Sequence, residues 1–402
     1  MAQAHRSQHW GPFWPACPGP LHRRVRGRRH AMGFPEELLA KAELLLVELE
    51  ADRATLGAEG EYLFQRTRLM RFVLANEGSV EDAAAQFRRM LQWRREANIA
   101  QIRANVKGRP WAAESVPGLD RLLGFMVMDL WGTTPTGDLL MVQCDGLTQF
   151  SGMSEVTDEE LNESLYSMLE LRQEHLDRMS EEQGRLVMVV QVRDLSGMAI
   201  MSLLSNARLI GQLQSVIKNG MDAYPECSKN TVLLNAPSSF EALMALVRPI
   251  TSARAQAKLK SVGLGQMEEM LALGGPESLR VLGRLRSDAG AAVSSAEVAA
   301  GSSAAGVLRV GAGEDVGWSF AVDAGSADIG LATPTLGFSV RFFPDAADSP
   351  AVEAKAYEDV SGKVSGEFLA REPGTLWAVW SNEQSWIQGV LLEELCGFER
   401  LW

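Results

Sequence analysis

The chain has 402 residues, of which 46% are hydrophobic and 22% charged, an ordinary globular composition with room for two or three domains. The net charge is −12 at pH 7. Because nonspecific nucleic-acid binding needs a basic face, this acidic balance argues against a nucleic-acid partner. The longest apolar runs, such as residues 186–190, fall far short of the ~20 residues that span a bilayer.

Histidine and cysteine usage limits the chemistry. Four of the five histidines lie within the first 30 residues, which leaves His175 alone in the body of the chain. The body of the chain therefore has too few histidines for a polyhistidine metal centre, and at most one for a serine–histidine–aspartate triad. We expect no metal and no cofactor. The four cysteines are far apart and form no C-x-x-C pair, which is typical of a reduced, intracellular chain.

Residues 1–33 predict a disordered basic extension, because Pro, Gly, Trp and Arg follow one another there without a period. Its run HRRVRGRRH could contact anionic lipid or act as a targeting signal. The alternatives are an unstructured extension without a role, or a natural start at Met32.

Residues 34–107 predict a helical subdomain. Leucines recur at helical spacing in PEELLAKAELLLVELEA, and RTRLMRFVLAN continues the pattern. Ser79 is a good N-cap for the next helix, and Asp82 suits its first turn. Phe87 and Leu91 predict a narrow apolar stripe with a basic flank at Arg94 or Arg95.

Residues 119–275 predict an α/β domain with a mixed sheet covered by helices. Continuous apolar runs indicate strands that are buried on both faces. The expected strands are 124–130, 138–147, 185–195 and 230–236, and the expected helices are 158–182 and 199–221.

The remaining chain changes character twice. Residues 276–305 predict a linker, and the stretch 288–305 is rich in Ala, Gly and Ser. From 306 to 396, short apolar runs alternate with Gly, Pro, Asn and Asp every 10–15 residues or so, which predicts an all-β sandwich.

Several spaced motifs resemble one known family. The segment RTRLMRFVLANEGSVEDAAAQFRRMLQWRRE is followed in order by DLSG, AYPE, LLNAPSSF, RPITSARAQAKLKSVG and LGG. This series resembles the CRAL-TRIO proteins, which include phosphatidylinositol/phosphatidylcholine transfer proteins and carriers of tocopherol and retinaldehyde. The landmarks WSF, DIG, FSVRFF, EPGTLWAVWSN and SWI make the C-terminal segment similar to a Golgi-dynamics (GOLD) domain.

The CRAL-TRIO resemblance implies an apolar ligand cavity closed by a gate helix. Phe240, Leu243, Met244 and Val247 follow the spacing of one helical face and are the expected gate. The expected floor consists of apolar residues on the predicted strands, namely Met126, Met128, Leu140, Val142, Val187, Val189 and Leu233. A solid core without a cavity, and an ordinary surface helix in place of the gate, are the alternatives.

The resemblance also implies a head-group site. Members that bind phosphatidylinositol use the glutamate of the YPE motif and a lysine 32 residues later, which correspond here to Glu226 and Lys258. An ammonium can neutralise a phosphate, while a carboxylate accepts hydroxyl groups or orients the lysine. The alternative is a surface ion pair worth less than ~1 kcal/mol.

Some positions depart from that pattern. Asn76 and Glu77 stand where the family carries a basic pair, and Val189 and Gln191 stand where phosphatidylcholine binders carry hydroxyl residues. Gln191 can still donate a hydrogen bond to a head group. The family's GRP hairpin is PTGDLL here. A sterol-like, tocopherol-like or other apolar ligand therefore stays open beside phospholipid.

The resemblance implies a lipid-binding and transfer protein that holds one hydrophobic ligand, is cytoplasmic and contacts membranes transiently at their periphery. The alternative is an adaptor with a degenerate lipid scaffold that recruits protein partners through the GOLD segment in membrane trafficking or signalling. We do not expect an enzyme, because the glycine-rich stretch GAGEDVG lacks the lysine of a phosphate-binding loop and lies in β-rich sequence.

Overall fold

The structure is a computed structural model. It describes residues 33–195, 198, 203–236, 240–262, 267–289, 296–298, 303–323, 335–346, 349–382 and 390–401. The predicted N-terminal extension, the DIG and SWI landmarks and the PSS residues of the LLNAPSSF motif lie outside these residues.

The N-terminal helical subdomain is present as predicted. Its helices are α1 (Glu36–Glu48), α2 (Glu50–Ala54), α3 (Ala58–Leu63), α4 (Arg66–Ala75), α5 (Val80–Glu96) and α6 (Ile99–Val106). Ser79 caps α5 by accepting a hydrogen bond from the backbone N–H of Asp82 at 3.2 Å. Phe72 of α4 and Phe87 of α5 stack edge-on with ring centroids 4.9 Å apart, so the two helices share one core.

The central unit is a five-stranded sheet in the order β1-β2-β3-β4-β5. Its strands are β1 (Val127–Thr133), β2 (Leu139–Cys144), β3 (Val189–Asp194), β4 (Ser228–Leu234) and β5 (Leu259–Val262). β1 pairs with β2 in antiparallel fashion and the other pairs are parallel, so the predicted mixed sheet is confirmed.

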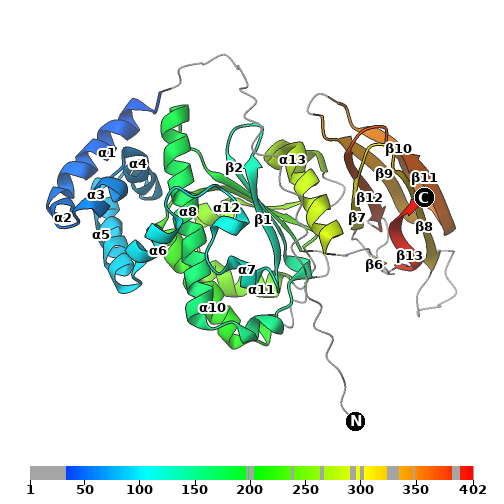
Figure 1. Cartoon of the computed structure of the whole chain (residues 1–402), viewed down its shortest axis with the longest axis horizontal. Coiled ribbons are helices and arrows are strands. Elements are labelled where there is room, and N and C mark those ends of the chain that lie inside the picture. Colours follow the sequence, from blue (N-terminus) through cyan, green and yellow to red (C-terminus); the bar gives the residue numbers. More distant parts are fainter. Residues whose placement is uncertain are drawn as a thin grey trace, which may run out of the picture.

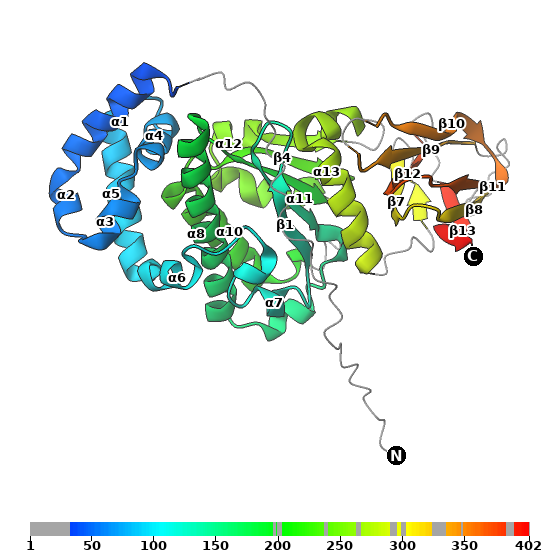
Figure 2. The same ribbon diagram turned by 45° about the horizontal axis from the view of Figure 1, so that its top comes forward.

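Helices cover both faces of this sheet, as Figures 1 and 2 show. They are α7 (Leu119–Leu122), α8 (Asp158–Gln183), α10 (Ala207–Ala223), α11 (Phe240–Val247), α12 (Ala253–Ala257) and α13 (Met267–Asp288), with short 3-10 turns at 113–115, 145–147, 152–155 and 248–250. Alternate strand residues face opposite sides. Val190 and Val192 pack toward α13, whereas Val189 packs in the core on the side of α8.

Helix α13 differs from the sequence prediction, which placed a linker from residue 276. The helix instead continues to Asp288 across a kink at Gly275, which has φ 74° and ψ 175°. A Cβ added at Gly275 would lie 2.4 Å from Cδ of Pro135, so only glycine fits this close approach. Pro276 follows the kink and restarts the helix, because proline suits a first helical turn.

The C-terminal part is all-β, as predicted, and consists of two four-stranded sheets in the orders β10-β9-β12-β7 and β11-β8-β13-β6. The strands are β6 (Ala296–Val298), β7 (Ser303–Val310), β8 (Asp315–Asp323), β9 (Leu336–Pro344), β10 (Val352–Val360), β11 (Gly362–Leu369), β12 (Gly374–Ser381) and β13 (Val390–Leu401). Phe320 of β8, Phe338 of β9 and Trp380 of β12 meet in one core between the sheets.

Helix α13 joins the two domains and lies between the five-stranded sheet and the β domain (Figure 1). Trp377 of β12 is 2% exposed and belongs to the same apolar cluster as Leu279 and Leu282 of α13. Gly283 approaches the β domain so closely that an added Cβ would lie 2.9 Å from Thr375. The β domain therefore sits on the side of the sheet opposite to α11.

Candidate functional site

The first candidate site is the charged cluster of Glu226, Arg254 and Lys258. Lys258 Nζ lies 2.9 Å from Glu226 Oε2, and Arg254 Nε lies 2.9 Å from Oε1 of the same carboxylate. The Glu226 side chain is only 10% exposed, whereas that of Arg254 is 49% exposed. One carboxylate thus faces two cations, which leaves the cluster with a net positive charge and an accessible arginine.

Arg71 of α4 stabilises the turn that carries Glu226. Glu226 has φ 53°, a left-handed conformation that is uncommon for a residue with a side chain. The buried Arg71 guanidinium donates to the backbone carbonyl of Glu226 and to that of Val187, each at 2.6 Å. These two bonds satisfy buried carbonyls and fix the start of β4 relative to the helical subdomain.

Tyr224, two residues before Glu226, is anchored by a buried network around Glu170 of α8. Its hydroxyl donates to Glu170 Oε1 at 2.5 Å, and Arg94 Nη1 of α5 lies 2.6 Å from the same oxygen. Burial alone would raise the pKa of Glu170, but the charge and hydrogen bond of Arg94, with Arg68, outweigh it and hold that pKa below its ordinary value. Burial first, and then Glu170, raises the pKa of Tyr224.

Among the described contacts, neither Asn76 nor Gln191 reaches the charged cluster around Glu226. Asn76 ends α4 and donates to the Phe72 carbonyl and to Gln86 Oε1, at 2.8 and 2.6 Å. Gln191 lies on β3 and pairs with Thr231 of β4, whose N–H bonds the Lys258 carbonyl. The backbones of Gln191 and Lys258 are therefore about two strand spacings, roughly 10 Å, apart.

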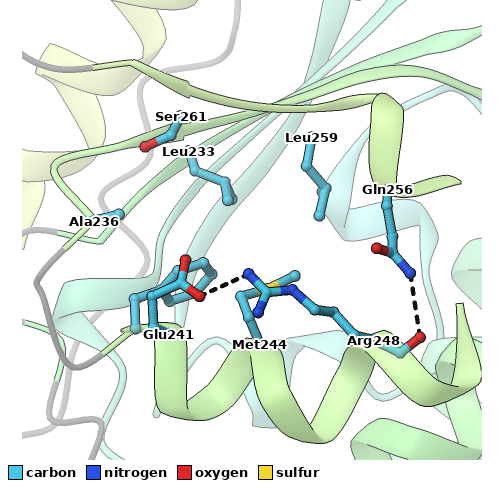
Figure 3. A pocket seen from close by; sticks show the side chains of 9 residues that line it. Leu233, Ala236, Glu241, Met244, Arg248, Gln256, Leu259 and Ser261 are labelled. Atoms are coloured by element: carbon cyan, nitrogen blue, oxygen red, sulfur yellow. Dashed lines mark hydrogen bonds and ion pairs between the residues drawn. The ribbon is translucent and has the colours of Figure 1, made fainter. Parts of the chain in front are cut away.

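The second candidate site is a cavity of about 420 Å³ between α11 and strands β4 and β5. Figure 3 shows Leu233 and Leu259 pointing from the sheet toward α11, with Met244 below them. The complete lining is Leu233, Ala236, Phe240, Glu241, Met244, Arg248, Gln256, Leu259 and Ser261. The cavity therefore has apolar walls and a charged rim.

The charged rim consists of Glu241 on α11 and Arg248 in the 3-10 turn that follows this helix. Arg248 Nη2 lies 2.6 Å from Glu241 Oε2, and Gln256 Nε2 donates to the Arg248 carbonyl at 3.2 Å. Glu241 and Arg248 are seven residues apart, which places them on the same side of the helix. Both side chains stay open to solvent, at 71% and 50% exposed.

A polar group lies next to the cavity on the same face of the sheet. Arg193 of β3 pairs in register with Leu233, and its Nε lies 2.7 Å from Asp145 Oδ2. Gln143 Nε2 donates to the other oxygen of Asp145 at 2.6 Å. The charge of Asp145 raises the pKa of Arg193. Apolar surface on this part of the sheet is therefore limited to β4 and β5.

Two of the predicted floor residues, Leu140 and Val142, lie on the opposite face of the sheet, in the core that α13 covers, because side chains alternate along a strand. The other predicted gate and floor residues separate into two groups. Phe240, Met244 and Leu233 line the cavity. Leu243 is instead buried in a small cluster with Leu203 and Leu209, because it faces α10, and Val247 is half-buried outside the lining.

The floor residues nearer α8 lie in the main core. Met128, Val187 and Val189 are buried there, and Met126 packs against it half-buried. They occupy the part of the sheet that α8 covers. Among the described residues, they contribute to packing and do not line the cavity.

Sequence reasoning missed several polar site residues. Arg254 had a usable signal, because it precedes Lys258 by one helical turn, and so had the i, i+7 pair Glu241 and Arg248. In the part of the chain that the structure describes, no group of three or more His, Cys, Asp or Glu side chains is arranged to hold a metal ion.

Comparison with protein families agrees with this architecture. Residues 145–280 match the family model of the CRAL/TRIO domain. The match contains both candidate sites except the supporting residues on the N-terminal helices. No family model assigns the C-terminal β domain to the GOLD family. No curated protein matches the chain.

Three solved structures show limited similarity. The crystal structure of Sfh5 is 13% identical with a TM-score of 0.37, over 56% of this chain and 78% of that chain. The CBM22-1 xylan-binding domain of Xyn10C from Paenibacillus barcinonensis is 21% identical with a TM-score of 0.18, over 23% and 62%. The family GH115 glucuronidase BtGH115A is 11% identical with a TM-score of 0.17, over 27% and 14%. None of the three assigns a function to this chain.

Proposed function

We propose that the chain is a lipid-binding and transfer protein that holds one hydrophobic ligand in a gated cavity and exchanges it with membranes. The observation that carries this proposal is the position of the cavity inside the CRAL/TRIO match, between α11 and the sheet. A carrier of this kind needs apolar burial comparable to that of a bilayer, because each methylene is worth ~0.8 kcal/mol. Leu233, Met244 and Leu259 supply such surface.

Helix α11 is suited to act as the gate. It has eight residues, and its one buried side chain, Leu243, packs in a small cluster that is separate from the two cores of the sheet. Moving α11 therefore disturbs few of the contacts that hold the sheet and its large helices together. Local opening of such weakly packed elements costs less than global unfolding.

The charged cluster supports a phospholipid head group as part of the proposal. Arg254 and Lys258 offer two cations near Glu226, and Arg254 is open to solvent. Charge-assisted hydrogen bonds from such cations to phosphate are strong. Family members with the corresponding glutamate and lysine bind phosphatidylinositol, which is therefore the phospholipid to test, and Arg254 is the additional residue that we propose to contact its head group.

The proposal places the protein in the cytoplasm, in transient contact with membrane surfaces and without catalytic activity. Within the described residues, no helix combines the length and the apolar character needed to cross a membrane. Ligand exchange then requires the mouth of the cavity, near Glu241 and Arg248, to approach the bilayer.

The C-terminal β domain is proposed as a GOLD-type module for a protein partner. Val352 and Tyr357 of β10 are 44% and 53% exposed, which leaves apolar surface on an outer strand. Affinity capture with the full chain and with a Val352→Glu, Tyr357→Glu variant tests this role. A partner that binds only the unchanged chain supports it, and equal capture by both chains refutes this surface.

Filling the cavity tests the central proposal. Met244→Trp puts a larger side chain into the cavity, whereas Leu246→Trp changes an exposed residue of the same helix that does not line it. We expect Met244→Trp to abolish lipid binding in native mass spectrometry and transfer between vesicles, with Leu246→Trp unchanged. Equal binding by both variants would show that lipid does not use this cavity.

A further inference from the structure

The cavity is small for a membrane phospholipid. Its volume of about 420 Å³ lies toward the lower end of the roughly 300–1,000 Å³ that is usual for pockets of drug-sized ligands. A two-chain phospholipid is larger than such ligands, whereas a single-chain amphiphile is of their size.

The apolar strip in the cavity is also narrow. Leu233 and Leu259 form it on β4 and β5, and Met244 and Phe240 face it from α11. On the neighbouring strand the position beside Leu233 is Arg193, ion-paired with Asp145. A second acyl chain placed over β3 would desolvate this charged pair, which is costly. The arrangement thus favours one chain.

The guanidinium of Arg248 lies next to the apolar strip. Figure 3 shows the Arg248 side chain extending along α11 past Met244 to Glu241, on the side of the helix that faces the sheet. The 2.6 Å ion pair with Glu241 joins two side chains that are both half or more exposed, so the carboxylate can leave into water at little cost. Arginine presents a planar fork that binds carboxylates and phosphates in bidentate fashion.

We propose that the cavity binds a single-chain amphiphile with an anionic head, and that Arg248 holds this head after releasing Glu241. The chain packs between Met244 and the leucines of β4 and β5. This inference rests on the proposed lipid-carrier function and names the ligand class of the same cavity. It makes Arg248 a specificity residue that is separate from the Glu226 cluster.

Four probes with chains of the same length test the ligand class. Binding to the full chain is measured by titration calorimetry, below the critical micelle concentration, for tetradecanoate, tetradecyl phosphate and tetradecanol. The fourth probe, a phosphatidate with two tetradecanoyl chains, is presented in vesicles. We expect either single-chain anion to bind at least tenfold more tightly than the alcohol, and the comparison of carboxylate with phosphate identifies the head group.

Three variants test the role of Arg248. Arg248→Met keeps an unbranched apolar stem and removes the guanidinium and its charge, and we expect about tenfold weaker anion binding with unchanged binding of the alcohol. Glu241→Gln removes the competing carboxylate and should tighten anion binding. Arg178→Met is the matched control, because Arg178 forms a similarly exposed ion pair with Glu182 on α8 at 3.0 Å and lies outside both candidate sites, and it should leave the affinity for both single-chain anions unchanged.

The outcomes separate this inference from the proposed function. Equal affinity for alcohol and anions would overturn the ligand class while the chain still binds lipid. Tighter binding of the two-chain phosphatidate, or an Arg248→Met variant that binds anions as tightly as Arg178→Met, would do the same. Absence of binding to all four probes, in a chain whose circular dichroism is that of a folded protein, would overturn both proposals.

Discussion

Replacement of Arg94 by methionine removes the cation that sustains the buried Glu170 carboxylate. Glu170 is 0% exposed, and its oxygens are shared by Arg94 and the hydroxyls of Tyr62 and Tyr224. Removing one partner of a buried ion pair leaves an uncompensated charge and costs about 3–5 kcal/mol. We expect a loss of this size in the free energy of unfolding at pH 7.

The pH dependence follows from the direction of the Glu170 pKa. In the unchanged protein this pKa lies below the ordinary 4.5, so its stabilising effect is present above pH 4.5 and is lost as the pH falls through the folded value. In Arg94→Met, fewer positive charges surround the buried Glu170 carboxylate, so burial raises the pKa of Glu170. The variant therefore takes up a proton on folding, and its deficit shrinks as the pH falls from 7 toward 4.5.

Urea unfolding followed by helical circular dichroism measures both effects, because every described helix lies between residues 36 and 288. Arg95→Met is the matched control, since Arg95 is the exposed neighbour of Arg94 and should change stability by about 0.5 kcal/mol or less. A loss in Arg94→Met no larger than in the control, or a deficit independent of pH, would refute the buried-charge reasoning.

Three further predictions concern the head-group cluster and the scaffold. If the Glu226 cluster binds the head group of phosphatidylinositol, Lys258→Ala should lower phosphatidylinositol transfer between vesicles about tenfold and spare an uncharged ligand, because it removes one charge-assisted contact; unchanged transfer would remove Lys258 from the site. Gly275→Ala should lower the melting temperature of the full chain, because its φ of 74° and the 2.4 Å approach to Pro135 exclude a side chain; an unchanged melting temperature would contradict this. Thr157→Ala should cost about 1 kcal/mol in urea unfolding, since Thr157 forms the capping box of α8 with Glu160; a cost near zero would mean that water replaces the cap.

Much of the fold could be predicted because its central strands are buried on both faces. The expected strands 138–147 and 185–195 contain β2 and β3, and the expected strand 230–236 overlaps β4, which begins two residues earlier; continuous apolar runs leave little ambiguity there. Strand β5 was missed, because LKSV is short and half polar at the edge of the sheet. Helix α13 was not among the expected helices, and its C-terminal half was assigned to a linker because Gly275-Pro276 resembles a helix end, whereas the structure accommodates it as a kink.

The candidate site was only partly predictable for a different reason. Glu226 and Lys258 are in contact, as the family resemblance implied, although their role with a lipid stays a prediction. Arg71 donates to Glu226 from 155 positions away, and no local pattern links the two. Leu243 was assigned to the wrong surroundings. Helical spacing identified the apolar side chains of α11, but it does not show which neighbouring element each side chain faces.

Lipid transfer by the cavity-filled protein tests the central claim most directly. Transfer of a fluorescent single-chain lipid between vesicles is measured for the full chain, for Met244→Trp and for Leu246→Trp. We predict that transfer is lost in Met244→Trp and unchanged in Leu246→Trp, because only residue 244 lines the cavity. Transfer by Met244→Trp at the rate of the unchanged chain would contradict the assignment of the cavity between α11 and the sheet as the lipid site.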